Sequence, residues 1–454
     1  MRLAEGTCDQ LSPEIARFAY DREAQRFGIV HFGIGVFHRA HQAWYTDLAM
    51  DAGDADWMIA GVSLRSDAVA QQLNPQDGLY TLTARSGARQ ETRLIGAVRE
   101  VLFAPDDSQA IIDRITSPDC RIVSFTVTEK GYARAEDGSL DLAAASASFY
   151  PHLTQGLRLR MKRGLPGVTL LSCDNIAANG RVLAALMVDW IEAECPELLD
   201  WFRRSCTVPS TMIDRIVPRT TQDDLAALEL RLGMEDLGAV FAEQFSQWVI
   251  EDDFAKGRPR WEVAGAQLVE DVAPYETAKL RMLNGGHSYL AYAGLRAGHE
   301  FVHEAIADPA LRKSTEELMQ QAASTVAAPV DLDLAAYAGE LVDRFADRAL
   351  RHRLSQIAMD GTQKLPQRWL DTARHLQRAG TPAIFLPEAL DAWIWHLSDG
   401  RFVDDPAGEE LSALARSGKR AVIQRCFYGR SEMSALWQGY TELVPLLRQE
   451  APPC

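Results

Sequence analysis

Short, continuous runs of apolar residues alternate with helix-like segments through the first half of the chain. The runs cover residues 28–35, 57–64, 121–128 and 167–173, and residues 37–50, after the first run, have helical spacing. Apolar runs of this length with helices between them are typical of parallel strands that are covered on both faces. The pattern therefore predicts a parallel sheet with covering helices.

Two other segments interrupt this alternation. Residues 80–102 alternate apolar and polar positions around a Ser-Gly turn at 86–87, which predicts an antiparallel hairpin inserted in the sheet. Residues 182–202 predict a long amphipathic helix, and Pro196 predicts a kink or a break in it.

The pattern changes near residue 270. From residue 275 to the end, almost every segment has helical periodicity. We therefore expect two domains, residues 1–270 and residues 271–454. The predicted fold class is an α/β Rossmann-like N-terminal domain followed by a mostly α-helical C-terminal domain.

The charge balance narrows the classes of partner. Subtracting 63 acidic from 47 basic residues gives a net charge of −16 over 454 residues, so the chain repels phosphate backbones and we expect no nucleic-acid partner. No apolar run reaches the roughly 18 residues of a membrane span, and the N-terminus lacks the apolar segment of a signal peptide. The seven cysteines are scattered without a CxxC pair, which favours reduced thiols. We expect a cytoplasmic protein with no membrane partner, either a monomer or a homodimer.

A glycine turn follows the first predicted strand. Gly33 and Gly35 stand where a Rossmann fold lets its backbone approach a pyrophosphate, but His38 replaces the third glycine of GxGxxG. His38 and Arg39 can compensate by reaching phosphate or ribose. A plain tight turn explains the same two glycines, so the motif alone is weak.

The second predicted strand ends with both types of residue that select a nicotinamide cofactor. Asp67 is suited to a ribose 2′-hydroxyl, whereas Arg65 is suited to a 2′-phosphate. Because an acid decides this choice more often, we expect NAD, with NADP as the alternative.

Residues 299–303 read HEFVH and match the HExxH pattern of zinc peptidases. No third ligand stands at a diagnostic spacing, and the segment also suits an ordinary surface helix. His31, His38 and His41 likewise lack acidic or thiol neighbours at ligand spacing, so we propose no metal site. A zinc metallopeptidase remains an alternative.

Residues 275–287, YETAKLRMLNGGH, carry the densest set of polar groups. At about 100° per residue, Lys279, Glu276, His287 and Asn284 share an arc of about 140° on one helix, next to a glycine pair. A solvated helix face would also gather charges, but it does not explain the glycines beside them.

The chain resembles the polyol-specific long-chain dehydrogenases and reductases, the family of mannitol 2-dehydrogenase and fructuronate reductase. The resemblance covers most of the chain in one order, and KxxxxNxxH is the family's catalytic signature. The matching text is GIGVFHRAH at 33–41, TVTEKGY at 126–132, LSCDNIAANG at 171–180, STMIDRIVP at 210–218, KLRMLNGGH at 279–287 and DGTQKLP at 360–366.

The resemblance implies a metal-free active site between a nicotinamide-binding domain and a helical domain. In it, Lys279 is the general base, Asn175 and Asn284 bond the reacting oxygen, His287 orients the substrate, and Glu276 relays the proton to solvent. The implied substrate-binding residues are Asp214 and Lys364, and the cofactor-binding residues are Gly33, Gly35, Phe37, His38, Arg39, Asp67 and Glu129.

One departure from the family bears on the substrate. Eight residues before Lys364, where relatives often carry an arginine, this chain has Gln356, although Arg351 or Arg353 can substitute. The loss of that arginine favours an uncharged polyol over a carboxylated substrate.

Alcohol oxidation explains why these residue types belong together. A lysine base needs its pKa lowered from about 10.4 toward neutrality, and burial does this. Two amide donors stabilise the developing alkoxide by roughly 2.7–4 kcal/mol each. We therefore predict an NAD-dependent polyol dehydrogenase that interconverts a hexitol such as D-mannitol and its 2-ketose, D-fructose.

Three alternatives stay open beside the peptidase. Fructuronate reductase, which interconverts D-mannonate and D-fructuronate, uses the same machinery, as does a dehydrogenase of another polyol such as arabinitol or sorbitol. A catalytically silent sugar-binding module is disfavoured by the intact Lys279, Asn284 and His287 set.

Overall fold

The computed structural model describes residues 1–87, 89–135, 137–329, 332–349, 351–429 and 433–448. The chain forms two compact units, Met1–Val272 (unit 1) and Ala273–Cys454 (unit 2). Each unit has its own hydrophobic cores.

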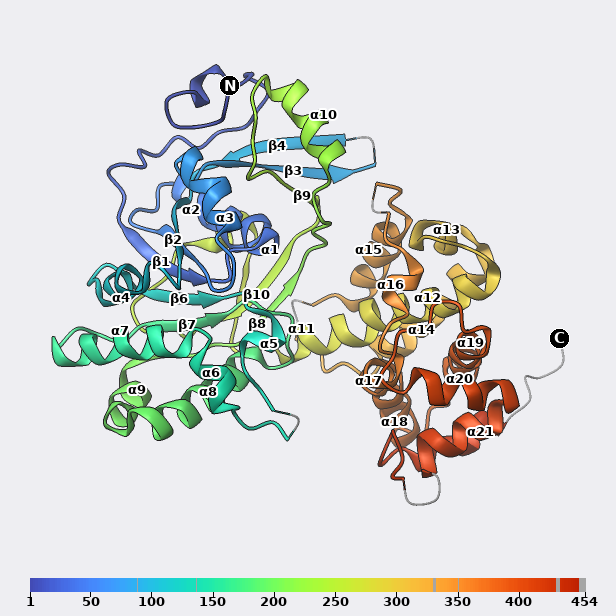
Figure 1. The fold of residues 1–454 in the computed structure, drawn as a ribbon. Helices are drawn as coiled ribbons and strands as arrows, with labels where there is room; N and C mark the ends of the chain where they lie inside the picture. The colour runs from blue at the N-terminus through green and yellow to red at the C-terminus, as the bar shows by residue number, and fades with distance from the viewer. Residues whose placement is uncertain (88, 136, 330–331, 350, 430–432, 449–454) are drawn as a thin grey trace. The chain divides into compact units, whose positions relative to one another are not determined.

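A five-stranded parallel sheet organises unit 1, as the apolar runs predict (Figure 1). In β1, Ile29 packs into one core whereas Val30 and Phe32 pack into another, so the sheet is buried on both faces. The strand order is β5 (Val98–Phe103), β2 (Met58–Ser63), β1 (Phe27–Phe32), β6 (Ile122–Phe125) and β7 (Thr169–Ser172).

Helices connect these strands. Figure 1 shows α4, α7, α8 and α9 together on one side of the sheet. The helix predicted at 37–50 is broken at His41, whose backbone leaves helical geometry (φ −125°, ψ −98°). The bounds are α1 (Val36–Ala40), α2 (Gln42–Asp51), α3 (Ala68–Leu73), α4 (Ser108–Thr116), α5 (Thr128–Gly131), α6 (Leu142–Ser146) and α7 (Tyr150–Lys162).

The predicted hairpin forms, but its placement in the parallel sheet is wrong. Strands β3 (Tyr80–Ser86) and β4 (Arg89–Ile95) pair antiparallel and join β9 (Val240–Glu243) in a separate three-stranded sheet. The chain leaves the hairpin at Gly96, whose N–H donates to the buried Asp47 carboxylate at 2.8 Å, and then enters β5 of the parallel sheet.

A third sheet completes unit 1. It contains β8 (Thr211–Asp214), β10 (Gln247–Glu251) and β11 (Gln267–Val269). The long helix predicted at 182–202 divides at Pro196 into α8 (Asn179–Glu194), a short 3₁₀ turn and α9 (Leu199–Ser205), which confirms the break. Helix α10 (Gln222–Leu232) precedes β9.

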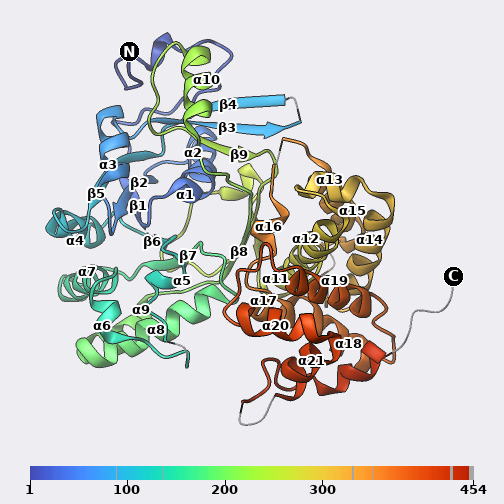
Figure 2. The same cartoon turned by 45° about the vertical axis from the view of Figure 1, so that its right-hand side comes forward.

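Unit 2 is helical, and the predicted fold class is confirmed. Helix α12 lies at its centre and contacts α13, α14, α16 and α19 (Figure 2). The bounds are α11 (Ala273–Ala278), the π-helical η5 (Lys279–Asn284), α12 (Gly285–Ala297), α13 (Val302–Ala307), α14 (Pro309–Ala323), α15 (Leu334–Ala346), α16 (Leu354–Ile357), α17 (Gly361–Leu365), the π-helical η6 (Pro366–Leu370), α18 (Asp371–Arg378), α19 (Phe385–Asp399), α20 (Gly408–Ser417), α21 (Lys419–Ile423), the π-helical η7 (Gln424–Tyr428) and the 3₁₀ segment η8 (Thr441–Arg448).

Within the described ranges, none of the helices combines the length and the apolar character that a membrane span requires.

Candidate functional site

The glycine turn of unit 1 lies at the switch point of the parallel sheet, where the strand order reverses between β1 and β6. Gly33 has φ +92°, and a Cβ there would collide with the Thr126 carbonyl at the end of β6. Its N–H donates to the Val62 carbonyl at 2.8 Å. The backbone therefore passes through a space that only glycine fits, at the place where open α/β sheets bind ligands.

The side chains that follow this turn face the interior of unit 1. The His38 imidazole is fully buried and stacks on His31, with ring centroids 3.4 Å apart. The Arg39 guanidinium is also buried and donates to the Gly238 carbonyl at 2.5 Å. Phe37 stacks on His41 at 5.3 Å. The side chains of His38 and Arg39 therefore pack inward, whereas Gly35 of the same segment is exposed.

Asp67 and Glu129 stand beyond the ends of β2 and β6, and both are exposed. The Asp67 carboxylate accepts a hydrogen bond from Gln71 Nε2 at 2.5 Å. Both residues therefore lie at the edge of the parallel sheet where the glycine turn also lies, because parallel strands end on one side.

Asp174 is a positioning residue that the sequence pattern did not single out. Its buried carboxylate accepts the N–H groups of Val127 at 2.9 Å and Thr128 at 3.0 Å, as well as the Tyr132 hydroxyl at 2.9 Å. Burial raises the pKa of Asp174, and the three donors act against that rise. Asp174 thereby joins the loop after β6 to the loop after β7, which carries Asn175.

Asn175 lies in the loop after β7 and Asp214 ends β8, and the buried side-chain amide of Asn179 joins these two segments. Asn179 donates from Nδ2 to the Asp174 and Thr211 carbonyls at 3.0 and 2.9 Å, and its Oδ1 accepts the Thr211 N–H at 2.9 Å. Asn175 is exposed in the loop that Asn179 closes, and the buried Asp214 ends the strand β8 that begins at Thr211.

The segment of unit 2 that the sequence predicts to be catalytic spans a change in helix type. Lys279 is the first residue of the π-helical segment η5 and Asn284 is the last, with α-helix before and after it. The uniform helical wheel predicted for residues 275–287 is therefore wrong, because a π-turn is wider than an α-turn. Lys279 and His287 are buried, while Asn284 and Glu276 are half-buried.

His287 lies among aromatic and basic neighbours. Its ring centroid is 4.2 Å from that of Phe345 and 5.5 Å from that of His352. Burial lowers the pKa of His287 well below its ordinary value, and the nearby His352, Arg344 and Arg368 lower that pKa further. The imidazole is therefore neutral near pH 7, and it can orient a hydroxyl as a donor or an acceptor.

Arg368, which the sequence pattern also missed, lies against the same turn. Its guanidinium Nη1 donates to Ser288 Oγ at 2.7 Å and to the Asn284 carbonyl at 3.4 Å. Burial lowers the pKa of Arg368 to about 10, so the group stays charged at neutral pH. In the part of the chain that the structure describes, no carboxylate forms an ion pair with Arg368 at contact distance, although the Asp360 carboxylate acts on it and raises its pKa.

The Lys364 side chain contacts the residues just before its own helix, α17. Its Nζ donates to the Met359 carbonyl at 2.8 Å and lies 3.3 Å from an Asp360 carboxylate oxygen. Gln356 is exposed on α16. The two arginines that could substitute for the family arginine both lie over the Phe301 ring, and Arg353 also pairs with Glu300.

The HExxH segment does not form a helix across its length. Helix α13 begins only at Val302, and Phe301 before it is extended (φ −120°, ψ 156°). His299 and His303 therefore do not face one way from a single helix, as a zincin requires. Within the residues that can be described, no group of three or more His, Cys, Asp or Glu side chains could hold a metal ion.

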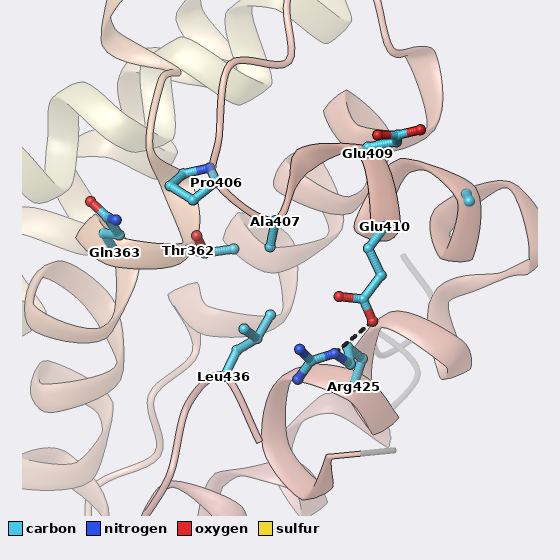
Figure 3. A pocket seen from close by; sticks show the side chains of 9 residues that line it. Thr362, Gln363, Pro406, Ala407, Glu409, Glu410, Arg425 and Leu436 are labelled. Atoms are coloured by element: carbon cyan, nitrogen blue, oxygen red, sulfur yellow. Dashed lines mark hydrogen bonds and ion pairs between the residues drawn. The ribbon is translucent and has the colours of Figure 1, made fainter. Parts of the chain in front are cut away.

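A cavity of about 850 Å³ lies beside α17, α20 and η7 of unit 2 (Figure 3). The Arg425–Glu410 ion pair, with a 2.7 Å contact, forms part of its wall. Thr362 and Gln363 of α17 also line it, but none of the residues predicted for catalysis does. The residues that line this cavity are therefore not those of the Lys279 motif.

A parallel sheet with a glycine turn at its switch point, followed by an all-helical unit, defines a two-domain Rossmann-type protein. Models of the two domains of one family match most of the chain. The mannitol dehydrogenase Rossmann domain matches residues 27–263, and the mannitol dehydrogenase C-terminal domain matches residues 271–424. The chain belongs to the mannitol dehydrogenase family, as the sequence resemblance indicates.

Relatives with different names match most of the chain. D-mannonate oxidoreductase of Escherichia coli (strain K12) is 43% identical over 81% of this chain and 79% of that protein. Mannitol 2-dehydrogenase of Phaeosphaeria nodorum is 36% identical over 89% of this chain and 76% of that protein. The structure of Pseudomonas fluorescens mannitol 2-dehydrogenase in a ternary complex with NAD and D-mannitol matches with a TM-score of 0.83 and 34% identity, over 98% of this chain and 95% of that one.

Proposed function

We propose that this protein is an NAD-dependent dehydrogenase that interconverts a hexitol such as D-mannitol and its 2-ketose, D-fructose, with a lysine as general base. The observation that carries the proposal is the Lys279, Asn284 and His287 set on η5 and α12, with Lys279 and His287 buried. The relatives named mannitol 2-dehydrogenase support the substrate class.

The glycine turn supports the cofactor. A pyrophosphate fits against backbone that carries no side chain at Gly33 and Gly35, and the exposed Asp67 suits an unphosphorylated ribose. We assign the backbone of residues 33–38, with Asp67 and Glu129, to cofactor binding. When bound, NAD supplies the hydride acceptor of the reaction.

Lys279 takes the proton from the substrate hydroxyl during oxidation and returns it during reduction. A neutral amine is required for the first direction and an ammonium for the second. The Asn284 side-chain amide, and by resemblance that of Asn175, donates to the same oxygen and stabilises the alkoxide that forms. Glu276, about one turn before Lys279, passes the proton toward solvent.

His287, Asp214 and Lys364 complete the proposed substrate contacts. The neutral His287 bonds a substrate hydroxyl without adding charge near the lysine. Asp214 and Lys364 meet the other hydroxyls by resemblance to the family. Together these polar groups suit a ligand with several hydroxyl groups.

A panel of substrates tests this function. Purified protein is assayed with hexitols, pentitols and hexonates in the presence of NAD or NADP, before and after treatment with a chelator. We expect the highest kcat/KM for a hexitol with NAD, unchanged by the chelator. Loss of activity on chelation would contradict the lysine base, and turnover only of hexonates would contradict the substrate.

One observation favours a second candidate, oxidation of D-mannonate to D-fructuronate. Arg368 stays charged, lies against the turn that carries Asn284, and forms no ion pair at contact distance with a carboxylate in the described chain. A guanidinium of this kind can bind a substrate carboxylate. The relative named D-mannonate oxidoreductase supports this candidate.

The two candidates differ in what Arg368 does. If the substrate is a hexonate, Arg368→Gln raises its KM by about 100-fold and Arg368→Lys restores part of the loss, because a charge pair contributes a few kcal/mol. If the substrate is a hexitol, both variants leave its KM within a few-fold. Arg374→Gln, which removes an arginine of α18 that pairs with Asp371, is the control.

A further inference from the structure

A line of buried hydrogen bonds runs through unit 1 to the carbonyl of Gly33. It joins Gln42 at the start of α2, Ser124 in β6, His31 in β1 and Thr126 after β6. The distances are 2.7 Å from Gln42 to Ser124 Oγ, 2.8 Å from Ser124 Oγ to His31 Nδ1, 2.8 Å from His31 Nε2 to Thr126 Oγ1, and 2.6 Å from Thr126 Oγ1 to the Gly33 carbonyl.

The last bond fixes the direction of the line. A carbonyl oxygen only accepts, so the one proton of the Thr126 hydroxyl must point at Gly33. Thr126 Oγ1 then has to accept from His31, which places the imidazole proton on Nε2. His31 is fully buried, and burial lowers its pKa to about 3, so the ring carries one proton only. Its Nδ1 is therefore an acceptor.

The same assignment of donors and acceptors extends through Ser124 to Gln42. Ser124 must give its single proton to His31 Nδ1, so it has to accept from the Gln42 atom 2.7 Å away. That atom is then the amide nitrogen, the reverse of the assigned orientation, and oxygen and nitrogen of an amide are told apart only by such networks. The other end of the Gln42 amide is buried and has no hydrogen-bond partner in the described chain, so the contact with Ser124 alone decides the orientation.

The His38 side chain holds the His31 ring, the middle of this line of hydrogen bonds, in place. Its ring stacks on His31 with 14° between the planes, and burial keeps the pKa of His38 well below its ordinary value. A neutral imidazole over His31 restricts the tilt of that ring without competing for its protons.

We infer that Gln42, Ser124, His31 and Thr126 form a one-way chain of donors that positions the Gly33 carbonyl, and with it the cofactor turn. Gly33 O also accepts the Gly35 N–H at 2.6 Å. Because the peptide group is planar, a fixed carbonyl sets the direction in which the chain enters Gly35 and α1. These four are positioning residues, and their effect on the cofactor rests on the proposed function.

The direction of the chain can be read without any cofactor. In the full-length protein with ¹⁵N-labelled histidine, the ring nitrogens of His31 report which one is protonated, and the His31→Gln variant identifies its signals. We expect a protonated Nε2 and an unprotonated Nδ1 throughout the range of about one pH unit on either side of pH 7. The opposite tautomer, or a doubly protonated ring, would overturn the inference whatever the protein binds.

NADH titration tests the consequence for the turn. Thr126→Val removes the hydroxyl that joins His31 to Gly33, so the Kd for NADH rises about tenfold, whereas Thr126→Ser keeps the chain and stays within twofold. Thr154→Val removes a buried hydroxyl that accepts from Trp190 on α8, far along the chain from the turn, and serves as the control for lost stability.

The three variants separate the explanations. Equal Kd values for Thr126→Val and Thr126→Ser would overturn the positioning role, as would an equal loss in Thr154→Val. Absence of NADH binding to the wild type would overturn the proposed cofactor but leave the tautomer result standing.

Discussion

The glycine turn of unit 1, proposed to bind the cofactor, and the segment Lys279–His287 of unit 2, proposed to be catalytic, are both short motifs, but they are built in different ways. In the Gly33–Gly35 turn the backbone carries the proposed function, and its neighbours His38 and Arg39 pack inward. In the segment from Lys279 to His287 the side chains carry the proposed function, and a π-helical stretch contributes to their directions.

This difference determines how well a local sequence pattern predicts which residues lie together. Strand ends of a parallel sheet fall on one side whatever their side chains are, so the positions after β1, β2, β6 and β7 converge automatically. A helix face, in contrast, depends on an even turn. One wide turn between Lys279 and Asn284 changes the angle between them, and tertiary packing decides where that turn occurs.

The largest effect is expected at the lysine of unit 2. Lys279→Met removes the proposed base while keeping a buried chain of similar length, so kcat for oxidation falls by about 10²–10⁴-fold and NADH affinity stays unchanged. In the wild type, oxidation becomes faster as pH rises and reduction slower, and the variant loses both dependences. Steady-state kinetics across pH, with Lys313→Met on the exposed face of α14 as control, measure this. Near wild-type oxidation by Lys279→Met would contradict the base.

The next effect tests the angle between Lys279 and Asn284 across the π-turn. Inserting one alanine after the half-buried Leu280 adds a helical step between Lys279 and Asn284, which rotates Lys279 by about 100° relative to Asn284. We expect kcat to fall at least about 100-fold, because one misdirected group costs nearly as much as its loss. Circular dichroism and NADH binding show whether helix content and unit 1 are preserved. Full activity in this variant would show that this angle is not needed.

A smaller effect is expected in unit 1, where a single side chain adjusts a backbone site. Asp67→Ala removes the charge that opposes a 2′-phosphate, so the ratio of kcat/KM for NAD over NADP falls by about tenfold. The control is Asp106→Ala, another exposed aspartate, after the neighbouring strand β5. Better use of NADP than of NAD by the wild type would assign the selection to Arg65 instead.

The last prediction concerns stability and not activity, and it involves one buried histidine of unit 2. In unit 2, burial lowers the pKa of His396 from 6.5 to about 4. Below pH 6.5 the unfolded chain binds a proton there that the folded chain does not, so the free energy of unfolding falls as the pH falls toward 4. The slope is up to about 1.4 kcal/mol per pH unit.

His396→Phe removes this contribution, so its free energy of unfolding depends less on pH between about 6.5 and 4. Urea unfolding at several pH values measures the difference, and the exposed His375→Phe is the control. A slope equal to that of the wild type would contradict the assignment of this acid sensitivity to His396.

Much of the candidate site could be predicted because its residues are close in the sequence or end predicted strands. Lys279, Asn284 and His287 lie within nine positions, and the glycine turn follows an apolar strand. Asp174, Asn179 and Arg368 were missed because their roles consist of bonds to distant segments. Asp174 meets residues 46 and 47 positions away, and Arg368 meets residues 80 and 84 positions away.

The sequence by itself determined the two-part fold, the apolar strands of the parallel sheet, the break at Pro196 and the family, because periodicity and contiguous motifs are local properties of a chain. Only the tertiary structure decided that the hairpin of β3 and β4 leaves the parallel sheet, that His38 and Arg39 face inward, and that a π-turn separates Lys279 from Asn284. Each of these outcomes depends on which distant groups compete for a buried position. His31 and Thr126, 95 residues apart, meet only because β1 and β6 are neighbours in the sheet.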